Sequence, residues 1–285
     1  MNAQGRPDVL VIGQTGQLAR ALALVGTADC TISFIGRPEV DLERPESVLR
    51  ALSLRRPDVV INAAGLTDGR LADAAPARAL AVNATGAGNL AEAAANIGAA
   101  VIQISTADVF DGRAAGACTE STTPAAIDTL GASKLLGEEL VLLRAPRSVI
   151  LRAGWLFSPW DCGAVLSGGH RLVSPCSALD LARICLWLAP TLAHAGPEAP
   201  YWGVTHCANG GVAREQDLVA SLARAGIQPN AYVGAPAARE ATRSVATLLD
   251  CQRLAQIFGH RMPHWEESLR EVLSVAVRTR EAVPA

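Results

Sequence analysis

The chain has 285 residues, enough to bury a large core, and alanine makes up much of its hydrophobic half, with only 4% aromatic residues. This composition suits helices packed on a sheet and argues against a β-sandwich. A formal net charge of −2 without a basic stripe gives no support to a nucleic-acid partner.

Short apolar runs alternate with helical patterns through the first half of the chain. Strands are expected at Asp8–Ile12, Thr31–Ile35, Asp58–Ala63, Ala100–Ile104 and Ser148–Leu151. Helices are expected at Gln17–Leu24, Pro45–Leu54, Ala77–Ile97 and Leu130–Leu143, the last with Glu138 and Glu139 on its polar side. This alternation predicts an α/β fold with a doubly wound parallel sheet of the Rossmann type and right-handed crossovers.

The pattern changes after Arg152, where prolines and glycines interrupt the chain up to Pro175 and predict loops. Further elements are expected as helices at Ala178–Leu188, Arg214–Ala225 and Pro263–Val277, a strand at Val204–Ala208 and a frayed tail from Arg278. We therefore expect a dinucleotide-binding domain over residues 1–154 and a smaller substrate-side lobe over 155–285, partly interwoven with the sheet.

The seven cysteines are odd in number, and no two have CxxC spacing. We expect buried thiols in a reducing compartment, not disulfides or zinc ligands. The first eight residues lack the basic and apolar parts of a signal peptide, and the apolar stretch Ile184–Ala189 ends at Pro190, too short to cross a bilayer. These features predict a cytoplasmic protein without a membrane partner.

A glycine-containing turn follows the first strand and opens the first helix. It reads Gly13-Gln14-Thr15-Gly16-Gln17-Leu18-Ala19, a GxxGxxA spacing. Gly13 allows a tight turn, Gly16 lets the backbone approach a pyrophosphate, and the helix N-terminus offers N–H groups to the anion. A purely structural strand-to-helix turn looks similar, but the place of this turn at the start of a βαβ series favours binding of a nicotinamide dinucleotide.

The end of the second strand bears on the choice of cofactor. Arg37 can pair with the 2′-phosphate of NADPH, whereas an acidic residue would hydrogen-bond the 2′-hydroxyl of NADH. Arg37 can equally be a solvated surface residue, and Asp41 is close by, so NADPH is favoured only mildly over NADH. Further cofactor contacts are expected from Asp41, Leu42, Ala63, Ala64 and Gly65.

Several stretches taken together identify a family. They are Gly13–Ala19, Arg56–Ala64, Ser105–Gly112 and Gly131–Glu139, with Leu249–Leu254 and Pro263–Leu269 near the C-terminus. In these stretches the chain resembles the extended short-chain dehydrogenase/reductases, and among them the dTDP-4-dehydrorhamnose reductases. The resemblance implies transfer of a hydride from NADPH or NADH to a keto group of a nucleotide-linked 6-deoxy sugar. It also implies that Thr106 binds the carbonyl, that Lys134 holds the nicotinamide ribose and that Trp155 lines the sugar site.

The chain departs from this family at three places. Leu130 stands where the family has the tyrosine that donates a proton, and Ala107-Asp108 replaces an Asp-Tyr pair. The segment from Trp155 to Asp180 is shorter than in the family and is expected to lack a helix that helps cover the sugar nucleotide. A positioned general acid contributes about 10²–10⁴-fold to a rate, so the departures indicate an altered or weak activity. Asp108, or a water on Thr106, is the alternative proton source.

Two functions from different classes remain open. The first is an NAD(P)-dependent reductase of a nucleotide sugar with a rerouted proton path. The second is a catalytically inactive NAD(P)-binding regulatory or structural subunit, working as a homodimer or with a regulatory partner.

The candidate residues also have simpler interpretations. Thr106 can bond its hydroxyl to the backbone, Lys134 can be a solvated lysine in the first turn of a helix, Asp108 can be a turn or cap residue, and Trp155 can belong to the core. No histidine has the spacing of a metal site or a catalytic triad, so no metal is expected.

Overall fold

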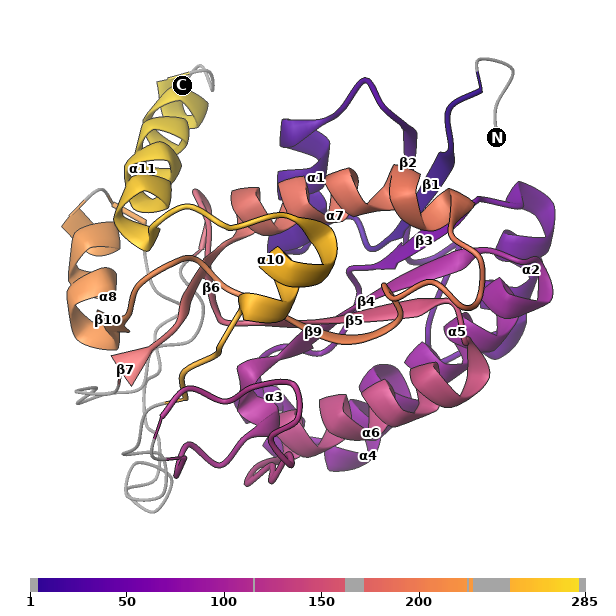
Figure 1. The fold of residues 1–285 in the computed structure, drawn as a ribbon, viewed down its shortest axis with the longest axis horizontal. Helices are drawn as coiled ribbons and strands as arrows, with labels where there is room; N and C mark the ends of the chain where they lie inside the picture. The colour runs from indigo at the N-terminus through magenta and orange to yellow at the C-terminus, as the bar shows by residue number, and fades with distance from the viewer. Residues whose placement is uncertain (1–4, 115, 162–171, 225, 228–246, 282–285) are drawn as a thin grey trace.

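The computed structural model describes residues 5–114, 116–161, 172–224, 226–227 and 247–281. Within them, six parallel strands form one sheet in the order β2-β1-β3-β4-β5-β9 (Figure 1). The strands are β1 (Asp8–Ile12), β2 (Thr31–Ile35), β3 (Val59–Asn62), β4 (Ala100–Thr106), β5 (Ser148–Ala153) and β9 (Gly203–Cys207). The predicted doubly wound, Rossmann-type sheet is confirmed.

Helices cover both faces of this sheet (Figure 1). One layer contains α1 (Gln17–Val25) and α7 (Ala178–His194), and the other contains α2 (Pro45–Arg55), α5 (Ala87–Asn96) and α6 (Thr129–Arg144). Alternate strand residues serve the two layers, because successive side chains of a strand point to opposite faces. In β1, Val9 and Val11 belong to the first core cluster, whereas Leu10 and Ile12 belong to the second. Burial on both faces explains why the strands read as unbroken apolar runs.

The C-terminal half of the chain completes the sheet and adds smaller elements around it. β9 pairs with β5, and α7 packs beside α1. Two short pairs join β6 (Trp155–Phe157) with β8 (Pro175–Ser177) and β7 (Leu172–Val173) with β10 (Ala213–Arg214). The remaining helices among the described residues of this half are α8 (Glu215–Arg224), α10 (Gln252–Phe258) and α11 (Trp265–Glu281). The division of the chain at residue 154 stays a prediction.

Several predicted elements are corrected by the structure. The single helix expected at Ala77–Ile97 consists of α4 (Pro76–Leu80), a π-helical turn η1 (Ala81–Gly86) and α5, and it follows an unpredicted α3 (Gly69–Ala74). The structure also contains α10, which was not predicted. The loops expected between Arg152 and Pro175 lie partly outside the described residues, and the described part of this segment contains β6, β7 and the start of β8. The expected lack of a covering helix between Trp155 and Asp180 stays a prediction, because residues 162–171 lie outside the described residues.

Two helices extend beyond their predicted ends. α7 continues through Pro190 to His194, because its buried apolar face outweighs the one backbone hydrogen bond that a proline removes. α11 reaches Glu281, so the predicted start of a frayed tail at Arg278 is wrong, and residues 282–285 lie outside the described residues.

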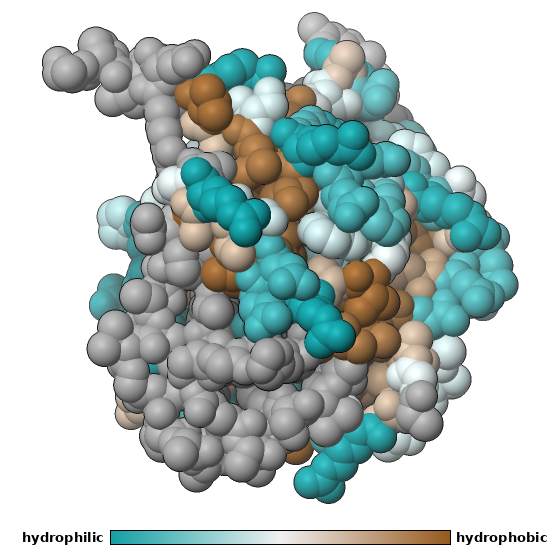
Figure 2. Space-filling model, turned by 90° about the vertical axis from the view of Figure 1, so that its left-hand side faces the viewer, coloured by the Kyte–Doolittle hydropathy of each residue, from teal (hydrophilic) through white to brown (hydrophobic). Residues whose placement is uncertain are grey.

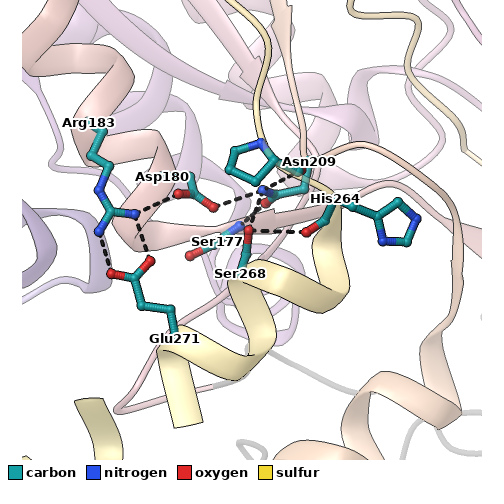
Figure 3. Close-up of polar contacts among 8 residues, drawn as sticks. Ser177, Asp180, Arg183, Asn209, His264, Ser268 and Glu271 are labelled. Carbon is teal, nitrogen blue, oxygen red and sulfur yellow. Dashed lines mark hydrogen bonds and ion pairs between the residues drawn. The ribbon is translucent and has the colours of Figure 1, made fainter. Parts of the chain in front are cut away.

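A polar network fastens α11 to α7 (Figure 3). The Asn209 amide donates to Asp180 Oδ2 and to Ser268 Oγ, both at 2.8 Å. Arg183 bridges Asp180, at 2.8 Å, and Glu271 on α11. Because Asp180 and Asn209 are buried, the network fixes where α11 begins relative to the sheet.

The face of the molecule that carries α11 has an open groove. It has a volume of about 470 Å³ and is lined by residues of α1, α7 and α11, among them Leu24, Leu179, Arg183 and Val275. Figure 2 shows hydrophobic residues between hydrophilic ones on this side of the molecule.

The six described cysteines are free thiols, and five of them are buried, as the sequence predicted. Cys162 lies outside the described residues. None of the described helices is both long and apolar enough to cross a membrane.

Candidate active site

The loop after β1 meets the end of β3 at the carboxyl edge of the sheet. A Cβ added to Gly13 would lie 3.2 Å from the carbonyl carbon of Ala63, and the φ of Gly13 is +117°, so this position needs glycine. A Cβ on Gly16 would lie 3.9 Å from the Ala63 oxygen, an ordinary contact. The fold therefore requires Gly13, whereas it tolerates a side chain at Gly16.

The start of α1 fits the phosphates of a dinucleotide. Gly16 is the N-cap residue and offers no side chain to the first N–H groups of the helix. The buried Oε1 of Gln17 has no hydrogen-bond partner among the described residues. β1 lies between β2 and β3, and such a switch point in an open α/β sheet is where ligands bind. Backbone donors, an open glycine and a spare polar atom thus lie together at the predicted loop.

The other predicted cofactor residues surround this point with different exposures. Arg37 is exposed just beyond β2, and the side chain of Gln14 lies along Gly36, whose added Cβ would be 3.1 Å from Gln14 Oε1. Asp41 Oδ1 accepts a hydrogen bond from the Glu43 N–H at 3.1 Å, which forms a turn before α2. Of the rest, Thr15 is exposed, Ala64 is half-buried, and the side chains of Leu18 and Leu42 pack in the core.

Lys134 lies in the first half of α6 and is 7% exposed. Its Nζ donates to the carbonyl oxygen of Ile104 at 3.3 Å and fills the space above Gly65, where an added Cβ would lie 2.8 Å from Nζ. Burial lowers the pKa of the Lys134 ammonium to about 8, and the charge of Glu138 opposes this fall. The interpretation of Lys134 as a solvated lysine is therefore wrong.

Asn83, in the π-helical turn η1, fixes the segment after β3 to the start of α6. Its Nδ2 donates to the Leu66 carbonyl at 2.9 Å and to Ser133 Oγ at 3.0 Å, and its Oδ1 accepts from the Leu66 N–H at 2.8 Å. π-helical turns are frequent at functional sites. Asn83 belongs to the Val82-Asn83 pair that contributes to the family resemblance, but the sequence did not predict its contacts with Leu66 and Ser133.

Leu130 lies one helical turn before Lys134 on the same side of α6. It packs against Leu66 and against Ala72 and Ala79 of α3 and α4. Leu130 and Lys134 therefore reach neighbouring residues, Leu66 and Gly65, as the four-residue spacing predicts. Of the two tyrosines in the chain, Tyr201 stacks on Phe258 with ring centroids 5.4 Å apart, and Tyr232 lies outside the described residues.

Thr106 ends β4 and caps the short 3₁₀ helix η2 (Ala107–Val109). Its hydroxyl oxygen accepts from the Asp108 N–H at 3.1 Å and donates to Asp108 Oδ2 at 3.2 Å. The simpler interpretation of Thr106, a hydroxyl bonded to the backbone, is thus confirmed. Trp155 lies on β6 and is partly buried against the main core. The predicted roles of Thr106, Asp108 and Trp155 in catalysis or substrate binding stay predictions.

Glu138 is buried, so its predicted place on the polar side of α6 is wrong, whereas Glu139 is exposed. The Arg152 guanidinium binds both oxygens of Glu138, with Nη2 at 2.6 Å from Oε2 and Nε at 3.0 Å from Oε1. Ser105 Oγ donates to Glu138 Oε1 at 2.5 Å. The pair holds α6 over the ends of β4 and β5. The partner of Glu138 comes from another element, which is why helical spacing gave no sign of it.

Comparisons with known proteins agree with this geometry. A family model described as the RmlD substrate binding domain matches residues 7–166 and 169–278. The chain is 30% identical over 283 residues to a dTDP-4-dehydrorhamnose reductase of Sinorhizobium fredii, which covers 92% of this chain and 95% of that protein.

Two solved structures share the fold. One is a dTDP-4-dehydrorhamnose reductase of Clostridium acetobutylicum, with a TM-score of 0.78 and 26% identity, covering 94% of this chain and 99% of the other. The second is a dTDP-4-dehydrorhamnose reductase of Bacillus anthracis in complex with NADP, with a TM-score of 0.78 and 23% identity, covering 96% and 100%. Since the family model spans nearly all of the chain, the protein belongs to the RmlD substrate binding domain family.

Proposed function

We propose that this protein reduces the keto group of a nucleotide-linked 4-keto-6-deoxy sugar, with NADPH or NADH as the cofactor. The observation that carries the proposal is the buried Lys134 at the ends of β3 and β4, on the same sheet edge as the Gly13–Ala19 loop. The substrate class is that of the relatives named dTDP-4-dehydrorhamnose reductase. Six free thiols also fit a reducing compartment, and we propose the cytoplasm.

The roles of this chain's residues follow from where they lie. When bound, the cofactor supplies the hydride. The first turn of α1 binds the pyrophosphate, and Lys134 hydrogen-bonds the nicotinamide ribose. Thr106 and Trp155 bind the keto sugar, and the apolar cluster of Leu66, Ala72, Ala79 and Leu130 keeps water from this side of the site.

A second candidate function is an inactive NAD(P)-binding subunit in a homodimer or with a regulatory partner. It is favoured by Leu130, because this side chain is settled among Leu66, Ala72 and Ala79 and cannot donate a proton.

A single-turnover assay separates the two functions. Enzyme saturated with NADPH is mixed with a dTDP-4-keto-6-deoxy sugar, and loss of NADPH absorbance is followed together with formation of the reduced sugar. We expect slow oxidation in a one-to-one ratio with product. Bound NADPH that is never oxidised would reject the reductase and support the binding subunit.

Gly16→Val is expected to weaken the binding of NADPH and of NADH alike. The Kd of each should rise by at least about tenfold, which corresponds to roughly 1.4 kcal/mol of binding free energy. The valine side chain occupies the place where the pyrophosphate approaches α1, whereas its Cβ makes only an ordinary contact, 3.9 Å from the Ala63 oxygen, so we expect the fold to be retained. Isothermal titration with both cofactors measures the effect. Gly196→Val is the matched control, because a Cβ there meets nothing within 4 Å. Unchanged binding in Gly16→Val would place the cofactor elsewhere.

Arg37→Ala is expected to weaken the binding of NADPH by roughly 1.5–3 kcal/mol, the contribution of a charge-assisted hydrogen bond. The binding of NADH should not change. Competition titrations with the two cofactors give the ratio directly. Arg50→Ala, at another exposed position on α2, serves as the control. Equal losses for NADPH and NADH would show that Arg37 does not bind the 2′-phosphate.

A further inference from the structure

Lys134 is the only lysine of the chain. Every other residue among the 25 lysines and arginines is an arginine. The two side chains differ chemically, because arginine keeps its proton under all physiological conditions, whereas a buried lysine can release one. A chain that uses arginine at every other basic position has thus kept an amine at the one that is buried beside Gly65.

The surroundings of Lys134 do not explain its charge as a structural ion pair. Among the described residues no carboxylate lies within ion-pair distance of Nζ, and the nearby Glu138 is bonded to Arg152 and Ser105. The ammonium has one hydrogen bond to a described residue, the 3.3 Å contact with Ile104. Burying a cation without a paired anion is costly, so Lys134 weakens the fold while it stands at the carboxyl edge of the sheet.

We propose that Lys134 is the proton donor of the reduction, taking the part that a phenol at position 130 would have. This inference rests on the reductase function proposed above. The carbonyl carbon gains a hydride, with its electron pair, from a reduced nicotinamide. The carbonyl π electrons move to the oxygen, which takes a proton from Nζ. The ketone is reduced to a secondary alcohol, the nicotinamide is oxidised, and the neutral amine regains a proton from water.

The acidity of Lys134 suits this role, since a general acid works best when its pKa is near the operating pH. Burial lowers the pKa of Lys134 to about 8, and Glu138 is the charge that limits the fall. The charged groups on or beside the first half of α6 and the elements packed against it are Asp68, Arg70, Asp73, Arg78, Asp108, Asp128, Glu138 and Arg152. Asp108 Oδ2 accepts a hydrogen bond from the Thr106 hydroxyl at 3.2 Å.

A single lysine makes the proposal directly measurable. Protein labelled with ¹³C at lysine Cε gives one side-chain signal, and its chemical shift against pH reports the ionisation of Lys134 with and without NADPH. We expect a midpoint near 8, as the structure gives. An ionisation midpoint of Lys134 above pH 10, both with and without NADPH, would overturn the proposal.

The kinetic arm compares this midpoint with the pH dependence of the single-turnover rate. The rate is expected to be level below the midpoint and to fall tenfold per pH unit above it. Lys134→Arg keeps the charge but cannot release a proton, so it is expected to lose at least about 10²-fold in rate, while NADPH titration still shows saturable binding. A rate in Lys134→Arg within a few-fold of the wild type would overturn the proposal.

One further variant tests the competing donor. Asp108→Asn is expected to keep the alkaline fall in rate at the same pH. If it abolishes reduction while Lys134→Arg keeps it, Asp108 is the acid instead. A wild type that binds NADPH but reduces no keto sugar rejects the reductase function itself. An active wild type whose rate does not follow the lysine midpoint rejects only the role of Lys134.

Discussion

Leu130→Tyr is expected to raise the rate of keto-sugar reduction by about tenfold or more. The gain stays below the roughly 10²–10⁴-fold that a positioned general acid contributes in all, because Lys134 already supplies a proton. Leu130 and Lys134 lie on one side of α6 and reach the adjacent residues Leu66 and Gly65, so a phenol at position 130 points towards the ammonium. The positive charge lowers the pKa of the phenol and stabilises the phenolate that remains after proton transfer.

The larger ring also has a cost. Leu130 is surrounded by Leu66, Ala72 and Ala79, and forcing a larger side chain into such a cluster costs typically 1–3 kcal/mol. The single-turnover rate is therefore measured beside the melting temperature. Leu136→Tyr, on the exposed side of the same helix, is the matched control and should not gain activity. If wild type and Leu130→Tyr both bind NADPH and both stay inert, the reductase function is rejected and the binding subunit is favoured.

Lys134→Met is expected to make the protein more stable at pH 7, by roughly 2–3 kcal/mol. Burial lowers the pKa of Lys134 from 10.5 to about 8, which corresponds to roughly 3 kcal/mol of lost stability when the amine is charged. The variant also loses the hydrogen bond to Ile104, which costs about 1 kcal/mol and offsets part of the gain in stability. Such a gain would show that Lys134 lowers the free energy of unfolding and is present for another reason than stability.

The pH dependence of this gain has a definite sign. Between pH 8 and 10.5 the unfolded chain holds a proton on Lys134 that the folded protein has released, so the stability of the wild type rises with pH in this window. The advantage of Lys134→Met is full below pH 8 and disappears as the pH approaches 10.5. Urea unfolding at several pH values measures the difference, and Lys134→Arg, which keeps the charge, should show no gain. A Met variant that is less stable at pH 7 would contradict the cost assigned to the buried ammonium.

The central sheet and the phosphate loop were predictable because their signals are local. The five apolar runs that were read as strands form β1 to β5, and the Gly13–Ala19 turn lies between β1 and α1 as expected. Both features depend on residues within one element and its immediate neighbour. The pairing of Leu130 with Lys134 was equally predictable, since it follows from the pitch of one helix.

The missed features depend on contacts between distant parts of the chain. Helical spacing places Glu138 on the surface, but the residue is buried because it binds Arg152 of β5. Asn83 lies in a π-helical turn, and its side chain bonds to Leu66 and Ser133. The course of α7 through Pro190 likewise depends on the core that the helix buries. In each case tertiary contacts decide the outcome, and these are not contained in the spacing of neighbouring residues.

The packing of α7 beside α1 also sets an order for biosynthesis. The faces of β1 and β3 that carry Val9, Val11, Val59 and Ile61 share a core cluster with α7, a segment made about 150 residues after α1 at ribosomal rates of roughly 5–20 residues per second. For on the order of ten seconds the nascent chain therefore has α1 but not α7 on this face, so part of the β-forming surface stays exposed, the kind that aggregates and that chaperones recognise. Production of this protein should accordingly depend on how fast it is translated and on chaperone supply far more than its finished stability suggests.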